Sequence, residues 1–64
     1  AELARVTAAM ARLPARLREA LVLRTVYGLT QAEAAEVLSV SEKTIETRLY
    51  RARSKLKAQL GDRM

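Results

Sequence analysis

The residues best suited to chemistry gather in the last third of the chain. Between residues 42 and 60 there are six basic residues against two glutamates, whereas residues 1–41 carry five arginines against four glutamates. The whole chain of 64 residues has a formal charge of +5. Positive charge concentrated on one segment is typical of proteins that bind nucleic acid. We therefore expect this segment to contact DNA or RNA.

The basic segment offers groups that could read base pairs and groups that could hold phosphates. An arginine can donate two hydrogen bonds to guanine, and a glutamate can accept one from cytosine N4. Contacts to phosphate position a protein without specifying sequence. We predict base contacts from Glu46, Thr47, Tyr50 and Arg51, and DNA backbone contacts from Gln31, Lys43, Thr44, Arg48 and Arg53. We expect Lys55 and Lys57 only to be solvated.

The residue types that usually catalyse reactions or bind metals are missing. The sequence has no histidine and no cysteine, and it contains no glycine-rich phosphate loop. Glu33 and Glu36 could pair on one helix face, but capping and solvation explain them as well. A metal would have to rely on carboxylates alone. We therefore predict a non-enzymatic protein with no catalytic residue, no metal and no cofactor.

The sequence also indicates where the protein acts and how many domains the chain contains. The longest apolar run, residues 20–23, is far too short to cross a bilayer. No signal peptide is visible, so we predict a cytoplasmic protein with no membrane partner. The length fits one domain, residues 1–64. Because the chain begins without methionine, we expect this domain to be a fragment of a longer protein.

The elements that position these residues can be read from apolar spacing and from helix-breaking residues. Pro14 and Gly28 interrupt the apolar periodicity, and Thr30 with Glu33 has the spacing of a capping box. Ser41 is a good N-cap for the last helix. We predict an all-α fold, a small bundle of four helices over residues 2–12, 15–27, 31–38 and 42–60.

The last two predicted helices have the spacing of a helix-turn-helix. This motif needs a small residue where the helices cross, a sharp turn, and a branched apolar residue in the second helix. Ala35, Ser39 and Ile45 stand at these places, with Ser39 where a glycine is usual. We predict a helix-turn-helix over about 31–53 with a long C-terminal recognition helix and a core of Ala35, Leu38, Val40, Ile45 and Leu49.

Some apolar residues allow two interpretations. Leu3, Val6 and Met10 share one helix face, which could pack in the core or bind a partner, and we prefer the core. We expect Tyr27 to be a half-buried core ring. A helical hairpin used only for packing would explain the core of the last two helices equally well. It would not explain why the outer face of the last helix is polar and basic.

At the level of motifs, the stretch from Leu13 to Leu56 resembles region 4 of bacterial sigma factors of the extracytoplasmic-function group. The resemblance lies in Leu13-Pro14, Arg18, Leu23, Gly28-Leu29-Thr30, Ala35-Glu36, Leu38, Ser41, Thr44-Ile45 and the run from Arg48 to Arg53. It implies a domain that binds the −35 element of promoters in double-stranded DNA and docks on the flap of the RNA polymerase beta subunit. It further implies control by an anti-sigma factor. Glu46 departs from the family, which commonly has lysine or arginine there.

Two other functions remain open from the sequence. The segment from Val40 to Ile45 is also similar to the output DNA-binding domain of a LuxR-type transcriptional regulator, in which a short break follows the recognition helix. Here the last helix continues through Arg53, which favours the sigma factor. The other alternative is a helical protein-interaction module. Its binding should depend little on salt, whereas DNA binding should weaken steeply as salt rises.

Overall fold

The computed structural model describes residues 2–61, and these residues form four helices. The helices are α1 (Glu2–Ala11), α2 (Ala15–Thr25), α3 (Gln31–Leu38) and α4 (Glu42–Leu60). The predicted all-α bundle is therefore confirmed. The predicted bounds of α3 and α4 are correct, whereas α1 ends one residue and α2 two residues earlier than predicted. No helix among the described residues is both long and apolar enough to traverse a bilayer.

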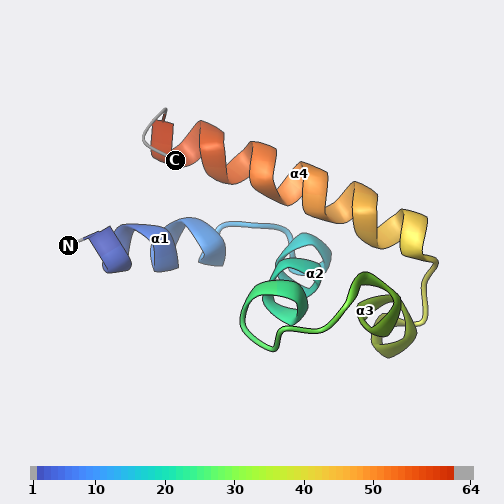
Figure 1. Cartoon of the computed structure of the whole chain (residues 1–64). Helices are drawn as coiled ribbons and strands as arrows, with labels where there is room; N and C mark the ends of the chain where they lie inside the picture. The colour runs from blue at the N-terminus through green and yellow to red at the C-terminus, as the bar shows by residue number, and fades with distance from the viewer. Residues whose placement is uncertain (1, 62–64) are drawn as a thin grey trace.

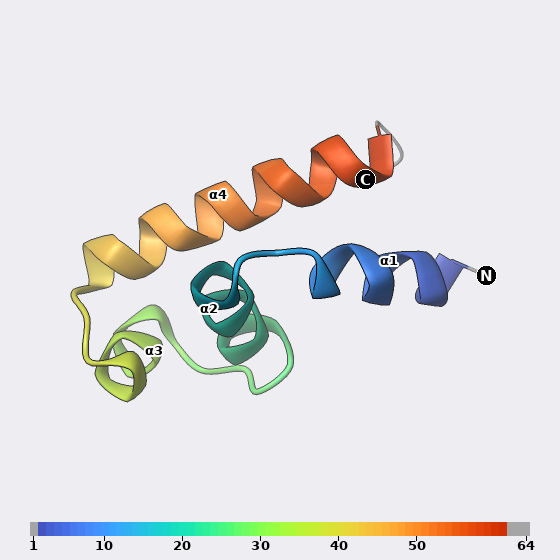
Figure 2. The ribbon, with the colours of Figure 1, turned by 180° about the vertical axis from the view of Figure 1, so that it is seen from behind.

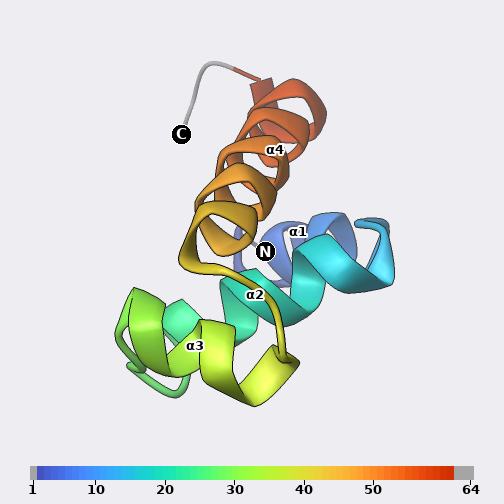
Figure 3. The ribbon, with the colours of Figure 1, turned by 90° about the vertical axis from the view of Figure 1, so that its right-hand side faces the viewer.

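Helix α4 runs the length of the molecule and organises the other three (Figure 1). Seen from both sides, α3 lies under its amino-terminal end, α2 under its middle and α1 under its carboxyl-terminal half (Figure 2). A view nearly along α4 shows that α1, α2 and α3 all lie on one side of it (Figure 3). Within residues 2–61, no other helix therefore covers the opposite side of α4.

The core follows from the apolar seam of α4. Residues that recur every three or four positions share one helix face, and five such residues of α4 are buried: Ile45, Leu49, Ala52, Leu56 and Leu60. They pack against buried residues of the other segments, namely Ala9, Leu13, Leu17, Ala20, Leu21, Ala34 and Ala35. Burying each leucine or isoleucine stabilises the fold by roughly 1.5–3 kcal/mol.

The breaks between helices agree with the residues found there. Pro14 stands at the N-cap position of α2 with φ −53° and ψ 143°, the extended geometry that proline favours. Gly28 has φ 67°, in the left-handed region that glycine adopts without steric cost. The side chain of Arg24 reaches over this turn and donates from Nη1 to the carbonyl oxygen of Leu29. These residues fix the path from α2 to α3.

The prediction that Tyr27 is a half-buried core ring is wrong, because its ring is 69% exposed. A helix continuing to residue 27 would place this ring seven residues after Ala20, on the buried face. Helix α2 instead ends at Thr25, and the chain turns away before the ring can reach the core.

The three apolar residues on one face of α1 lie in different environments. Val6 and Met10 pack against the core, as preferred from the sequence. Leu3 is 78% exposed, so the preference for the core is wrong at this position.

Candidate nucleic-acid interface

The first helix of the motif is held by a capping box. The hydroxyl of Thr30 accepts a hydrogen bond from the Glu33 backbone N–H at 3.1 Å, and the Glu33 carboxylate accepts one from the Thr30 N–H at 2.8 Å. These bonds satisfy donors that a helix start leaves without partners. Next to this cap, Gln31 Nε2 donates to the carbonyl oxygen of Glu42 at 3.2 Å. The start of α3 is thus tied directly to the start of α4.

The turn between α3 and α4 is sharp. Ser39 has φ 56° and ψ 45°, a left-handed conformation that is unusual for a residue other than glycine. Behind it, the Val40 N–H donates to the Ala35 carbonyl at 3.0 Å and so closes the end of α3. The Ser41 hydroxyl then caps α4 by accepting from the Thr44 N–H at 3.1 Å. The chain changes direction within three residues.

The two helices of the motif pack through small and branched residues. Ala34, Ala35, Ile45 and Leu49 are buried, and Ile45 is fully inaccessible to solvent. Leu38 and Val40 are half-buried and pack against this cluster. An alanine at position 35 lets the backbones of α3 and α4 approach closely. All five residues predicted for the core of the motif are therefore brought together.

The face of α4 opposite this core carries most of the predicted DNA-contacting residues. Glu46, Tyr50 and Arg51 are exposed, as are Lys43 and Arg53. Thr44, Thr47 and Arg48 are half-buried, and so is Gln31 on α3. The ring of Tyr50 is 72% exposed and is therefore accessible to a ligand. This arrangement is what a helix that enters a DNA groove requires.

Two details change how the predicted contacts are grouped. The ammonium of Lys43 lies 3.5 Å from the Glu46 carboxylate, so each of these exposed charges partly offsets the other. Arg48 and Arg53 are five residues apart and therefore point about 140° apart around α4. Arg53 lies beside Met10, Leu21 and Thr25, whereas Arg48 faces the start of α2. The two arginines therefore lie on different flanks of α4.

Two basic residues that were not among the predicted DNA contacts stand next to this face: Arg16, which was not considered, and Lys55, which was expected only to be solvated. Arg16 of α2 and Lys55 of α4 line an open hollow together with Arg48 and Arg51. The position of Lys55 could have been found from its spacing, because it lies four residues after Arg51 and seven after Arg48. The position of Arg16 could not, because it depends on how α2 crosses α4.

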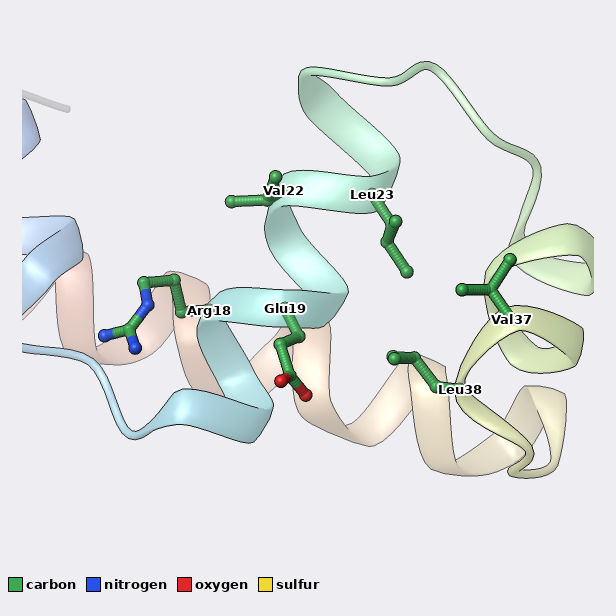
Figure 4. Close-up of a pocket in the computed structure, with 6 residues that line it drawn as sticks. All are labelled: Arg18, Glu19, Val22, Leu23, Val37 and Leu38. Carbon is green, nitrogen blue, oxygen red and sulfur yellow. The ribbon is translucent and has the colours of Figure 1, made fainter.

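A second hollow, between α2 and α3, is mainly apolar. Leu23 of α2 points toward Val37 and Leu38 of α3 (Figure 4), and Arg18, Glu19 and Val22 complete the lining. Val37 is 60% exposed although it is apolar. This hollow belongs to α2 and α3, whereas the polar face belongs to α4. The molecule therefore offers one surface suited to a charged ligand and another suited to an apolar one.

Together, the fold and this outer face define a helix-turn-helix domain, the architecture in which one helix is presented to the major groove of DNA. Residues 3–56 match the family model of sigma-70, region 4. The chain belongs to the sigma-70 region 4 family, and the resemblance to region 4 of extracytoplasmic-function sigma factors is confirmed.

Two curated relatives agree with this assignment. The chain is 48% identical over 59 residues to "RNA polymerase sigma factor CnrH" of Cupriavidus metallidurans and covers 31% of that protein, with 92% of this chain aligned. It is 41% identical over 59 residues to "RNA polymerase sigma factor NccH" of Alcaligenes xylosoxydans xylosoxydans, with 92% of this chain and 32% of that protein aligned. The chain thus spans about a third of the length of these relatives. No solved structure matches it significantly.

Proposed function

We propose that this chain is the domain of an extracytoplasmic-function sigma factor that binds the −35 element of promoter DNA. The observation that carries the proposal is the division of α4 into two faces. Its apolar seam is buried, whereas Glu46, Tyr50 and Arg51 are exposed, and the other three helices all lie on one side of α4 (Figure 3). In this proposal Glu46, Thr47, Tyr50 and Arg51 contact bases, and Gln31, Lys43, Thr44, Arg48 and Arg53 contact phosphates.

The unbroken course of α4 separates this proposal from the LuxR-type alternative. Helix α4 continues from Glu42 to Leu60 without the short break expected after the recognition helix of that family. Membership in the sigma-70 region 4 family supports the same choice. The role is one of binding rather than catalysis, and residues 1–64 act as one domain of a longer sigma factor.

The apolar hollow between α2 and α3 supports the second part of the proposed function, docking on RNA polymerase. Region 4 domains grip the flap of the beta subunit largely through apolar contacts, and Val22, Leu23 and Val37 offer such contacts (Figure 4). An anti-sigma factor that covered this hollow would keep the domain from the polymerase. The alternative of a helical protein-interaction module is therefore part of this proposal, because the polymerase and an anti-sigma factor are both protein partners.

The two tyrosines provide a matched test of DNA recognition. We expect Tyr50→Ala to weaken binding to the promoter and to alter base preference, because misreading one base pair of a specific site costs about 1–3 kcal/mol. Tyr27→Ala removes an equally exposed ring from the end of α2 and should leave DNA binding unchanged. The measurement is a footprint of the polymerase holoenzyme, assembled with each full-length variant, on promoter fragments.

Two results would contradict this assignment. Equal losses in the Tyr50 and Tyr27 variants would show that α4 has no special role. A Tyr50 variant that kept the affinity and base preference of the unmodified protein at the −35 element would place recognition elsewhere.

A further inference from the structure

We propose that the basic hollow between the start of α2 and the middle of α4 binds a phosphate of the DNA backbone beside the base pairs that α4 reads. Arg16 and Lys55 are the new contact residues, and they act together with Arg48. The inference rests on the proposed function and extends it, because neither Arg16 nor Lys55 belongs to the recognition face considered so far.

The charges around this hollow are all of one sign. Arg16, Arg48, Arg51 and Lys55 line it, and no carboxylate does. Within residues 2–61, the ion pairs join Arg5 to Glu2 and Lys43 to Glu46, so none involves these four cations. Like charges held close together repel each other. An anion seated among them would offset that repulsion, which makes the hollow suited to a phosphate.

The hollow is continuous with the recognition face of α4. Arg48, Arg51 and Lys55 are spaced by three and four residues and therefore form one strip along the helix. This strip borders Thr47 and Tyr50, two of the proposed base contacts. When a helix lies in the major groove, the residues along its flank face the sugar-phosphate strand that forms the wall of the groove. Arg48 and Lys55 would thus meet phosphates, whereas Arg51, which also belongs to the recognition face, reaches the base edges.

Arg16 closes the hollow from a different helix. It lies in the first turn of α2, and only the packing of α2 on α4 brings it near Arg48 and Lys55. Pro14 at the N-cap position offers no side chain to cap the backbone N–H groups of this end. The partial positive charge of the helix start adds to that of the side chains. The four cationic side chains, however, carry the proposal.

DNA fits this hollow better than an acidic protein does. The recognition face and the hollow share Arg51 and lie on adjoining strips of α4, so one duplex can contact both. The surface suited to a protein partner is the apolar hollow between α2 and α3, which has a different lining (Figure 4). An acidic protein segment is therefore the alternative that the experiment must separate.

The test compares single charge removals in the full-length protein bound to RNA polymerase core. The variants are Arg16→Ala, Lys55→Ala and the charge-preserving Arg16→Lys. Arg12→Ala is the matched control, because Arg12 is also exposed but lines a separate hollow beside Gln59 and Leu60. Affinity is measured over a range of KCl concentrations on a labelled promoter duplex and on a duplex with a shuffled −35 element. Single methylphosphonate substitutions then locate the phosphate.

We expect Arg16→Ala and Lys55→Ala each to weaken binding about three- to tenfold on both duplexes. Each should reduce the salt slope by about 1, as the loss of one phosphate contact does. Arg16→Lys should restore most of the affinity, and Arg12→Ala should change it less than about twofold. One methylphosphonate should weaken binding of the unmodified protein and have no further effect on Arg16→Ala.

Three outcomes would overturn the inference: an unchanged salt slope, a loss confined to the promoter sequence, or a loss of affinity for the polymerase core instead of DNA. The last would indicate an acidic protein partner. If these variants bind DNA normally while Tyr50→Ala loses base preference, only this inference fails. If neither set of variants alters binding at the −35 element, the proposed function fails as well.

Discussion

The two ends of α4 are held in different ways. At the amino-terminal end, α3 packs on both α4 and α2, and three capping hydrogen bonds fix Thr30, Glu33 and Ser41. At the carboxyl-terminal end, α1 packs mainly on α4 and buries only Ala9 of its own residues. The end that would meet DNA is therefore the end fixed by more interactions.

This difference has a functional reason. A recognition helix must present its side chains in one orientation before it reaches the groove, because ordering them on binding would reduce the affinity. The caps and the buried Ile45 fix that orientation near the reading residues. Helix α1 instead covers the far half of α4 and only needs to shield Leu56 and Leu60 from water. Stability measurements can test whether the two ends differ as strongly as the packing indicates.

The largest effect is expected at the centre of the better-held end. Ile45→Ala removes three heavy atoms from a fully buried site and should lower the free energy of unfolding by about 2–5 kcal/mol. Leu3→Ala on α1 is the control, and it should change stability by less than about 0.5 kcal/mol because Leu3 is largely exposed. Urea unfolding followed by circular dichroism measures both. Comparable losses would show that α1 is as firmly held as α3.

A smaller loss is expected where α3 and α4 cross. Ala35→Leu adds volume to a site that is 5% exposed and should destabilise the protein by about 1–3 kcal/mol through overpacking. Ala32→Leu makes the same change on the exposed side of α3 and should be nearly neutral. Thermal melts of the two variants provide the comparison. If Ala35→Leu melted at the same temperature as the unmodified chain, the close approach of the two helices would be refuted.

Most of the fold could be predicted from the sequence because local signals and apolar spacing agree. Thr30, Glu33 and Ser41 mark helix starts, and the structure shows each of them forming the expected cap. The seam from Ile45 to Leu60 gives α4 its length and its buried side. Tyr27 was misplaced because the end of α2 is set by how the chain turns at Gly28, and spacing alone does not show that helix α2 stops at Thr25.

The candidate site was harder to predict from the sequence than the fold was. Helical periodicity was enough to put Glu46, Thr47 and Tyr50 on one side of α4. The same periodicity separates Arg48 from Arg53, but these two residues were grouped by type and not by their angle around the helix. Arg16 was missed for a more basic reason. It approaches α4 only through the packing of two helices, and no pattern within either helix encodes that meeting.

The smallest expected effect is also the one that bears most directly on the turn before the recognition helix. Ser39 holds a left-handed conformation, φ 56°, which a residue with a Cβ adopts at some cost. Ser39→Gly should relieve this strain and raise stability by up to about 1 kcal/mol, after the greater freedom of glycine in the unfolded chain is counted. Ser54→Gly makes the same change inside α4 and should lower stability by about 0.5 kcal/mol. Opposite signs in urea unfolding would show that position 39 is strained by the turn itself. If both variants lost stability equally, Ser39 would not occupy the left-handed region in solution, and the sharp entry into α4 would need another explanation.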